Sequence, residues 1–172
     1  MNTAEVECIL RRTMEGNIVQ FAGVYAADSV PSVLECPSCL VVNTDPARRP
    51  GEHWVAYYAK TPTDVEFFDS YGLPVDAYPH IRLPYKITKQ NVVSLQAMDS
   101  IACGHFCIYY LCMRAQGITL DRVAKRLSRL DAAQRDALVR RFVSKITSSL
   151  HIRRPCRDAC VGSQCCGKRV LQ

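Results

Sequence analysis

One segment, residues 102–116, is apolar at nearly every position, and it limits what this chain can fold into. A helix that is apolar on all sides has to be surrounded by other elements, so the segment predicts a helix in the middle of the domain. Gly117 follows directly, as is typical after a helix C-terminus. Cys103 stands at the start of the segment, where the polar stretch SLQAMDSI ends. The sequence therefore predicts a cysteine at the N-terminus of a buried helix.

The other segments alternate between strand and helix patterns. Runs rich in β-branched and aromatic residues predict strands at 40–44, 53–60, 65–72 and 87–96. Amphipathic spacing predicts helices at 3–14, 119–130 and 131–150, with Thr3, Thr119 and Asp131 as their N-caps. This arrangement predicts the α+β class, with a central mixed β-sheet packed by helices.

The length of 172 residues, with 48% apolar and 22% charged residues, is typical of one globular domain with a hydrophobic core. We expect this domain to span residues 1–155 and a basic, cysteine-rich tail to span residues 156–172. No apolar run reaches the roughly 20 residues that cross a bilayer, and acidic residues interrupt the apolar N-terminal positions, unlike in a signal peptide. We therefore expect an intracellular monomer without membrane contact.

The ten cysteines do not indicate a disulfide scaffold in an intracellular protein. Cys107 and Cys112 lie within the apolar helix and are expected in the core. A non-catalytic zinc-binding interaction module is an alternative, because Cys36 and Cys39 have ligand spacing and four tail cysteines could complete a site. These are Cys156, Cys160, Cys165 and Cys166. Their irregular spacing, without a finger-type histidine, disfavours zinc, and no metal site is predicted.

Positive charge is concentrated in the C-terminal third. Residues 1–120 carry nine basic and twelve acidic side chains, a balance of −3, whereas residues 121–172 carry thirteen basic and four acidic ones, a balance of +9. A basic region of this kind attracts polyanions such as DNA through phosphate contacts. Basic side chains also line ordinary solvated helix faces, so the charge pattern alone leaves both interpretations open.

Cys103 has the position expected of a reactive thiol. The free N–H groups and the dipole at a helix N-terminus favour an anion, so they lower the pKa of a thiol placed there. Gly104, which has no side chain, would leave room for a substrate backbone beside the sulfur. A thiolate nucleophile also needs a base, and that base needs a third group to orient it.

His53 and Asp69 are candidates for those two roles. His53 begins a predicted strand and Asp69 lies near the end of the next one, so adjacent strands could bring imidazole and carboxylate together. Gln96 lies seven residues before Cys103, and its amide could join the Cys103 backbone N–H in stabilising an oxyanion. Each residue also has an ordinary structural interpretation, and only the four together predict a cysteine peptidase site.

Four anchors in matching order resemble the adenovirus proteinase (adenain) family, which belongs to the clan of Ulp-type SUMO-deconjugating proteases. They are CLVVNT, GEHWVAYYA, VEFFDSYG and SLQAMDSIACGHFC, within about residues 21–111. The resemblance implies an adenain/Ulp-like cysteine protease fold with the nucleophile at the N-terminus of a buried helix. It implies that His53, Asp69 and Cys103 form the catalytic triad. It further implies Gln96 at the oxyanion hole and Trp54 at the active-site wall.

The same resemblance implies substrates, location and effectors. The expected function is a cysteine endopeptidase that cleaves viral capsid or core precursor proteins near glycine during virion maturation, in the host nucleus or the virion. No cofactor is required for the chemistry. The family is stimulated by DNA, which agrees with the basic C-terminal third, and by a short disulfide-bound peptide. Because this chain has no cysteine between Cys39 and Cys103, only a non-covalent activating peptide is left open.

Two other peptidase classes compete with this interpretation. A SUMO- or ubiquitin-type deconjugating protease would use the same fold and catalytic residues, and cleavage of conjugates would identify it. A caspase-like peptidase would share the Ala-Cys pair and a histidine about 50 residues upstream. That class has glutamine directly before the Ala-Cys pair, where this chain has Ile101, and it gives Asp69 and Gln96 no role. The sequence therefore disfavours a caspase.

Overall fold

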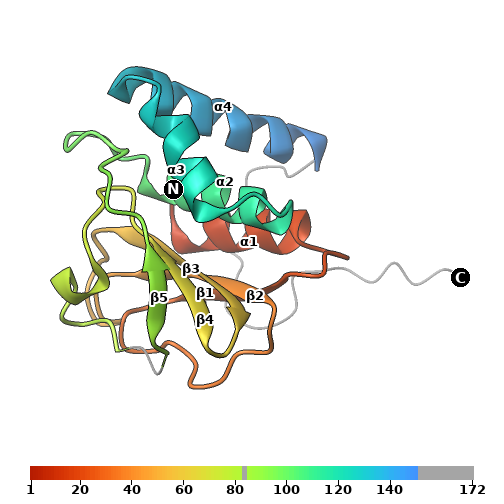
Figure 1. The fold of residues 1–172 in the computed structure, drawn as a ribbon, viewed down its shortest axis with the longest axis vertical. Helices are drawn as coiled ribbons and strands as arrows, with labels where there is room; N and C mark the ends of the chain where they lie inside the picture. Colours follow the sequence, from red (N-terminus) through yellow and green to blue (C-terminus); the bar gives the residue numbers. More distant parts are fainter. Residues whose placement is uncertain (83–84, 151–172) are drawn as a thin grey trace, which may run out of the picture.

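The structure is a computed structural model, and it describes residues 1–82 and 85–150. The boundary predicted at residue 155 and the cysteine-rich tail predicted at 156–172 lie outside the described residues. In the described part, the strands form one layer and the four α-helices gather on one side of it (Figure 1).

Five strands form one sheet in the spatial order β1-β2-β3-β4-β5. Their bounds are Gln20–Tyr25 for β1, Ser38–Asn43 for β2, Trp54–Thr61 for β3, Asp64–Phe68 for β4 and Ile87–Gln90 for β5. β1 is parallel to β2 and β4 is parallel to β5, whereas β2, β3 and β4 are antiparallel neighbours. This mixed sheet with packed helices confirms the predicted α+β class.

The helices are α1 Thr3–Thr13, α2 Cys103–Ala115, α3 Leu120–Ser128 and α4 Ala132–Ser149, with a 3₁₀ turn, η1, at Val75–Ala77. α2 packs on β3 and is in contact with α1, α3 and α4 (Figure 1). Apolar side chains around α2 form one core cluster, and a second cluster lies on the opposite face of the sheet. The predicted central helix is thus confirmed. None of the described helices combines the length and the apolar character needed to span a membrane.

The C-terminal turn of α2 carries a buried positive charge, which neighbouring side chains compensate. Residues 106–114 are all buried, Arg114 included. Its guanidinium lies 2.8 Å from the Glu66 carboxylate of β4 and 4.1 Å from the centre of the Tyr58 ring. Tyr110 donates a hydrogen bond to the same Glu66 carboxylate, at 2.8 Å. Gly117 has a φ of +79°, which explains why the helix ends where the sequence predicts.

The strand predicted at 87–96 is wrong beyond Gln90. Segment 91–102 instead crosses the end of β4, because the backbone N–H groups of Leu95 and Gln96 both donate to the Ser70 carbonyl, at 2.8 and 2.9 Å. One carbonyl that accepts from two successive residues is not part of a strand ladder. The consequence is that Gln96 lies on a loop fixed to the residue after Asp69.

Three further local predictions differ from the structure. The strand predicted at 65–72 ends at Phe68, because the Gly72 N–H donates to the Asp69 carbonyl at 2.9 Å and turns the chain away from the sheet. The first helix is capped by Asn2 and not by Thr3: the Asn2 side chain accepts from the Glu5 N–H while the Glu5 side chain accepts from the Asn2 N–H. β1 was not predicted, because Gly23, at a φ of +141°, interrupts its pattern with a bulge. The caps predicted at Thr119 and Asp131 are confirmed.

Candidate active site

Three of the predicted site residues come together at one end of the sheet. His53 directly precedes β3 and Asp69 directly follows β4, and the antiparallel pairing of these strands places the two residues at the same end of the sheet. Cys103 is the first residue of α2, which packs across β3. The sheet and the buried helix thereby bring together an imidazole, a carboxylate and a thiol that are distant in sequence.

Asp69 is fully buried, and its carboxylate accepts four hydrogen bonds. Oδ1 accepts from His53 Nε2 at 2.6 Å and from the Tyr71 backbone N–H at 3.1 Å. Oδ2 accepts from the Leu73 N–H at 2.8 Å and from the Tyr78 hydroxyl at 3.0 Å. Since an ionised carboxylate only accepts, Nε2 of His53 carries a proton and Nδ1 is left for the thiol.

The surroundings of His53 favour the charged imidazolium. Burial by itself lowers the pKa of the ring, but side-chain hydrogen bonds with Asp69 and Cys103, and the negative charge of both groups, raise the pKa from 6.5 to about 9. The Tyr71 ring stacks on the imidazole with the two ring centres 4.6 Å apart. The ring is therefore fixed in orientation and cationic at neutral pH.

Cys103 differs from the other cysteines near it. Burial raises the pKa of its thiol, but the hydrogen bond and the charge of His53, followed by backbone hydrogen bonds from Trp54 and Gly104, bring the pKa below the ordinary 9.0. No side chain of the described residues caps the N-terminus of α2, so its N–H groups are available to an anion. Burial instead raises the pKa of Cys112 to about 12 and that of Cys107 well above 9.0. Only Cys103 of these three has the environment of a nucleophile.

These two shifts predict a bell-shaped pH dependence for peptide hydrolysis. The active pair needs Cys103 deprotonated and His53 protonated. The rate should therefore rise with pH as the thiol ionises, below 9.0, and fall as pH passes the imidazole pKa of about 9. Alkylation of Cys103 by iodoacetamide should show the rise without the fall, since a free thiolate still reacts. An alkylation rate that first rises at pH 9 or above would contradict the ion pair.

Gln96, the fourth predicted residue, is buried beside this group and is held at both ends of its amide. Its Oε1 accepts from the Ser70 hydroxyl at 2.7 Å, and its Nε2 donates to the Ser100 carbonyl at 2.6 Å. Among the described residues, the other amide hydrogen has only a long contact of 3.5 Å, to the Tyr71 hydroxyl. That hydrogen is left available to another acceptor.

Gly72 supports the segment that carries Gln96. It has a φ of +73°, and a Cβ there would lie 2.6 Å from the Val93 carbonyl carbon and 2.8 Å from the Ser94 nitrogen. Gly72→Ala should lower the free energy of unfolding by about 2 kcal/mol through strain and reduce kcat by displacing Gln96. Gly16→Ala is the matched control, because Gly16 has the same φ and a Cβ there would meet no atom of the described residues within 4 Å. Equal losses of activity in the two variants would contradict this role.

A cleft of about 550 Å³ opens beside the thiol. It is lined by Cys103, Gly104, Trp54, Tyr71 and the exposed side chains of Met98 and Ile101, together with residues 1–3, 43, 50–52 and 99–100. Trp54 is at the wall, as predicted. The space beside Gly104 differs from the prediction: a Cβ there would meet the Met1 sulfur at 3.2 Å and the Trp54 ring at 3.5 Å. Gly104 therefore lets these side chains pack close to Cys103 as well as lining the cleft.

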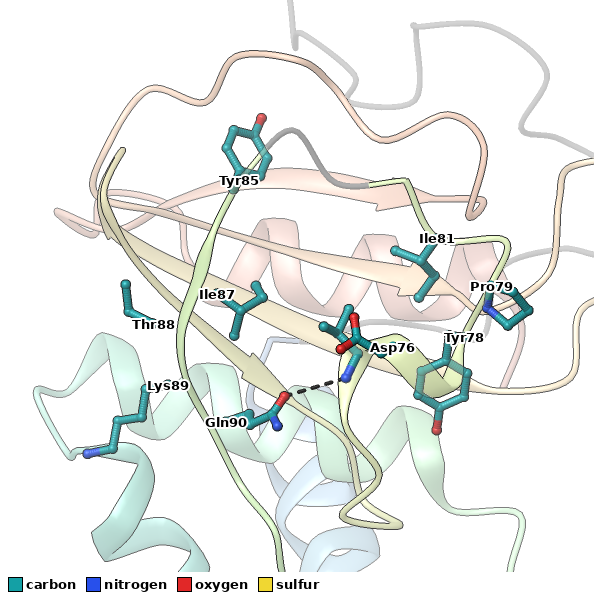
Figure 2. A pocket seen from close by; sticks show the side chains of 10 residues that line it. Asp76, Tyr78, Pro79, Ile81, Tyr85, Ile87, Thr88, Lys89 and Gln90 are labelled. Carbon is teal, nitrogen blue, oxygen red and sulfur yellow. Dashed lines mark hydrogen bonds between the residues drawn. The ribbon is translucent and has the colours of Figure 1, made fainter.

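A second cavity, of about 670 Å³, lies on the other face of the sheet, between β5 and η1 (Figure 2). Gln90 spans it by accepting a hydrogen bond from the Val75 N–H at 3.4 Å. Tyr78 lines this cavity and also donates to Asp69. Four residues that support the site were not predicted from the sequence: Ser70, Tyr71, Tyr78 and Ser100. The only signal for them in the sequence is that Ser70 and Tyr71 follow Asp69 directly.

The zinc-module alternative finds no support in the part of the chain that the structure describes. No group of three or more His, Cys, Asp and Glu side chains is arranged there to hold a metal ion. Cys39 lies buried in β2, and burial raises the pKa of its thiol to about 12, which disfavours the thiolate that zinc needs. The four tail cysteines lie outside the described residues.

No family model matches this chain, and no curated protein matches it. Among solved structures, it is similar to the crystal structure of the selenomethionine ASFV pS273R protease, with 18% sequence identity and a TM-score of 0.38. The similarity covers 60% of this chain but 42% of that one. The chain thus spans less than half the length of that protease.

Proposed function

We propose that this protein is a cysteine endopeptidase in which Cys103 is the nucleophile. The observation that supports this most is a chain of three interacting groups at the cleft: a thiol of lowered pKa, an imidazole of raised pKa and a buried carboxylate. His53 is then the general acid–base group, and Asp69 orients it and stabilises its charge.

In this proposal the Cys103 thiolate attacks the carbonyl carbon of the scissile bond, and the negative charge moves to the carbonyl oxygen. The Cys103 backbone N–H and the free amide hydrogen of Gln96 donate to that oxygen. The intermediate collapses to a thioester as the His53 imidazolium gives its proton to the leaving amine. His53, now neutral, takes a proton from the water that hydrolyses the thioester, and the ion pair is restored.

We further propose that the substrates are viral precursor proteins cleaved near glycine during virion maturation, in the host nucleus or the virion. The sequence anchors that resemble adenain support this. The tight packing of Met1 and Trp54 against Gly104, next to the nucleophile, also favours residues without side chains at the scissile bond. Cleavage of SUMO or ubiquitin conjugates in preference to capsid precursors would redirect the proposal to a deconjugating protease.

Covalent trapping tests the proposed nucleophile directly. A peptide vinyl ester ending in Gly-Gly should modify the wild-type protein at one position, Cys103, as located by peptide mass spectrometry. Cys103→Ala should not be modified, and His53→Ala should be modified much more slowly because its thiol is no longer paired with a cation. Modification of another cysteine would contradict the proposal. Equal rates of modification in wild type and His53→Ala would contradict it as well.

DNA is a proposed partner, bound through the basic C-terminal third. Exposed basic side chains on α3 and α4 support this: Arg122, Lys125, Arg126, Arg140, Arg141 and Lys145. A duplex should be retarded in a gel at low salt and released as salt increases, because phosphate contacts displace counterions. Charge reversal at Arg141 and Lys145 should weaken retardation, whereas Arg12→Glu on α1 serves as a control. Unchanged retardation after the reversal would exclude α4 as the contact.

A further inference from the structure

Ser100 makes four hydrogen bonds next to the proposed oxyanion site. Its backbone N–H donates to the Ala97 carbonyl at 3.0 Å and closes a turn. Its carbonyl accepts from Gln96 Nε2 at 2.6 Å, and its hydroxyl accepts from the Ala102 N–H at 3.2 Å. The same hydroxyl donates to the Asp136 carboxylate on α4, at 2.5 Å. One residue thus connects the Gln96 amide, the backbone just before Cys103 and a helix near the end of the described chain.

The first turns of α4 contact the loop at a second point. Arg135, the neighbour of Asp136, donates from its guanidinium to the Ser94 carbonyl at 2.9 Å. α4 itself is fixed at its start by a capping box between Asp131 and Gln134. Two successive α4 side chains therefore contact both ends of segment 94–100, which carries Gln96 in between.

Apart from Ser100, the groups around the Asp136 carboxylate interact with it only weakly. Its side chain is 21% exposed, the nearest cation is Arg140 at 3.9 Å, and Oδ1 is buried without a hydrogen-bond partner among the described residues. A carboxylate that only contributed to the surface charge would point toward solvent or toward Arg140. The short contact to Ser100 is instead its principal interaction.

We propose that Asp136 is a positioning residue for the peptidase reaction, acting through Ser100 to hold the Gln96 amide toward the oxyanion. This inference rests on the proposed function of Cys103. With the Ser100 hydroxyl held, the Ser100 carbonyl keeps one Gln96 hydrogen, so the other hydrogen is directed toward the hydroxyl of Tyr71, a residue of the cleft wall. Without Asp136 the turn at residues 97–100 keeps its backbone hydrogen bond from the Ser100 N–H to the Ala97 carbonyl but loses its connection to α4. The Ser100 carbonyl is then held less firmly, the Gln96 amide rotates, and the oxyanion loses a donor for part of the time.

The test compares four variants on an internally quenched peptide with a central Gly-Gly. Asp136→Ala and Ser100→Ala should each lower kcat about tenfold, less than the 10²–10³-fold loss of a whole oxyanion donor, with KM within about twofold. Asp136→Asn should keep most activity, since its side-chain oxygen still accepts from Ser100. Asp121→Ala, which removes an exposed aspartate of α3, is the matched control and should match wild type.

A mutant cycle separates positioning from general damage. In a Gln96→Ala background, Asp136→Ala should lower kcat less than about twofold further, because the group it orients is gone. The rate of Cys103 alkylation by iodoacetamide, which needs no oxyanion donor, should be unchanged in Asp136→Ala. A full tenfold loss in the Gln96→Ala background, or a parallel fall in alkylation, would overturn the inference. Activity retained in Cys103→Ala would instead refute the proposed function, whatever Asp136 does.

Discussion

Cys103→Ala is expected to remove all measurable peptide hydrolysis, while Cys107→Ala is expected to keep it. Loss of the nucleophile in a triad enzyme reduces kcat by about 10⁶, so activity should fall below detection. Cys107 lies one turn further along α2, is fully buried, and donates from its sulfur to the Trp54 carbonyl at 3.3 Å. Its thiol has neither the imidazole nor the helix N-terminus that lowers the pKa of Cys103.

The pair of variants is informative because both remove one sulfur from the same helix. Neither alanine leaves a large cavity, and melting temperatures close to wild type for Cys103→Ala would show that lost activity is chemical. Hydrolysis that survives in Cys103→Ala at more than about one part in 10⁴ would defeat the assignment. Cys103→Ser is a useful third variant, since a hydroxyl keeps the shape but cannot form an ion pair with His53.

The central helix and the relative placement of three site residues could be predicted because each depends on a short local pattern. An unbroken apolar segment can only be a buried element, and Cys103 begins it whatever the rest of the fold. His53 and Asp69 sit at opposite ends of consecutive strands, and an antiparallel connection brings such ends together. The periodicity of the apolar residues and the order of the elements along the chain are sufficient for these predictions, without knowledge of tertiary contacts.

The surroundings of Gln96 could not be predicted in the same way. Its segment has strand-like residues, and only the Ser70 carbonyl, 25 residues before Leu95, turns it into a loop. The contact between Ser100 and Asp136 spans 36 residues and joins a loop to a solvent-facing helix whose pattern signals only amphipathicity. Interactions of this range depend on how whole elements pack, so a single sequence gives no sign of them.

Asp69→Asn is expected to lower kcat by about 10³–10⁴-fold while leaving a folded protein. Replacement of the triad acid by its amide has this size of effect because the histidine takes the wrong tautomer. The four groups that contact the Asp69 carboxylate are all hydrogen-bond donors. An amide NH₂ facing His53 would therefore force Nε2 of His53 to become an acceptor. The ring proton would then lie on Nδ1, and a protonated Nδ1 can no longer accept a proton from Cys103.

The same substitution should change the pH profile in a defined direction. The hydrogen bond and the charge of Asp69 raise the pKa of His53 toward about 9, so their loss should move the alkaline limb of the rate to lower pH. Glu66→Gln is the control: it also neutralises a buried carboxylate of this strand region, but it contacts Arg114, eleven residues from Cys103 and thus roughly 16 Å along α2. Glu66→Gln should lose stability and keep its alkaline limb near pH 9. If Asp69→Asn retained the wild-type limb, the carboxylate would not be the group that holds the imidazole charged, and His53 would need another partner.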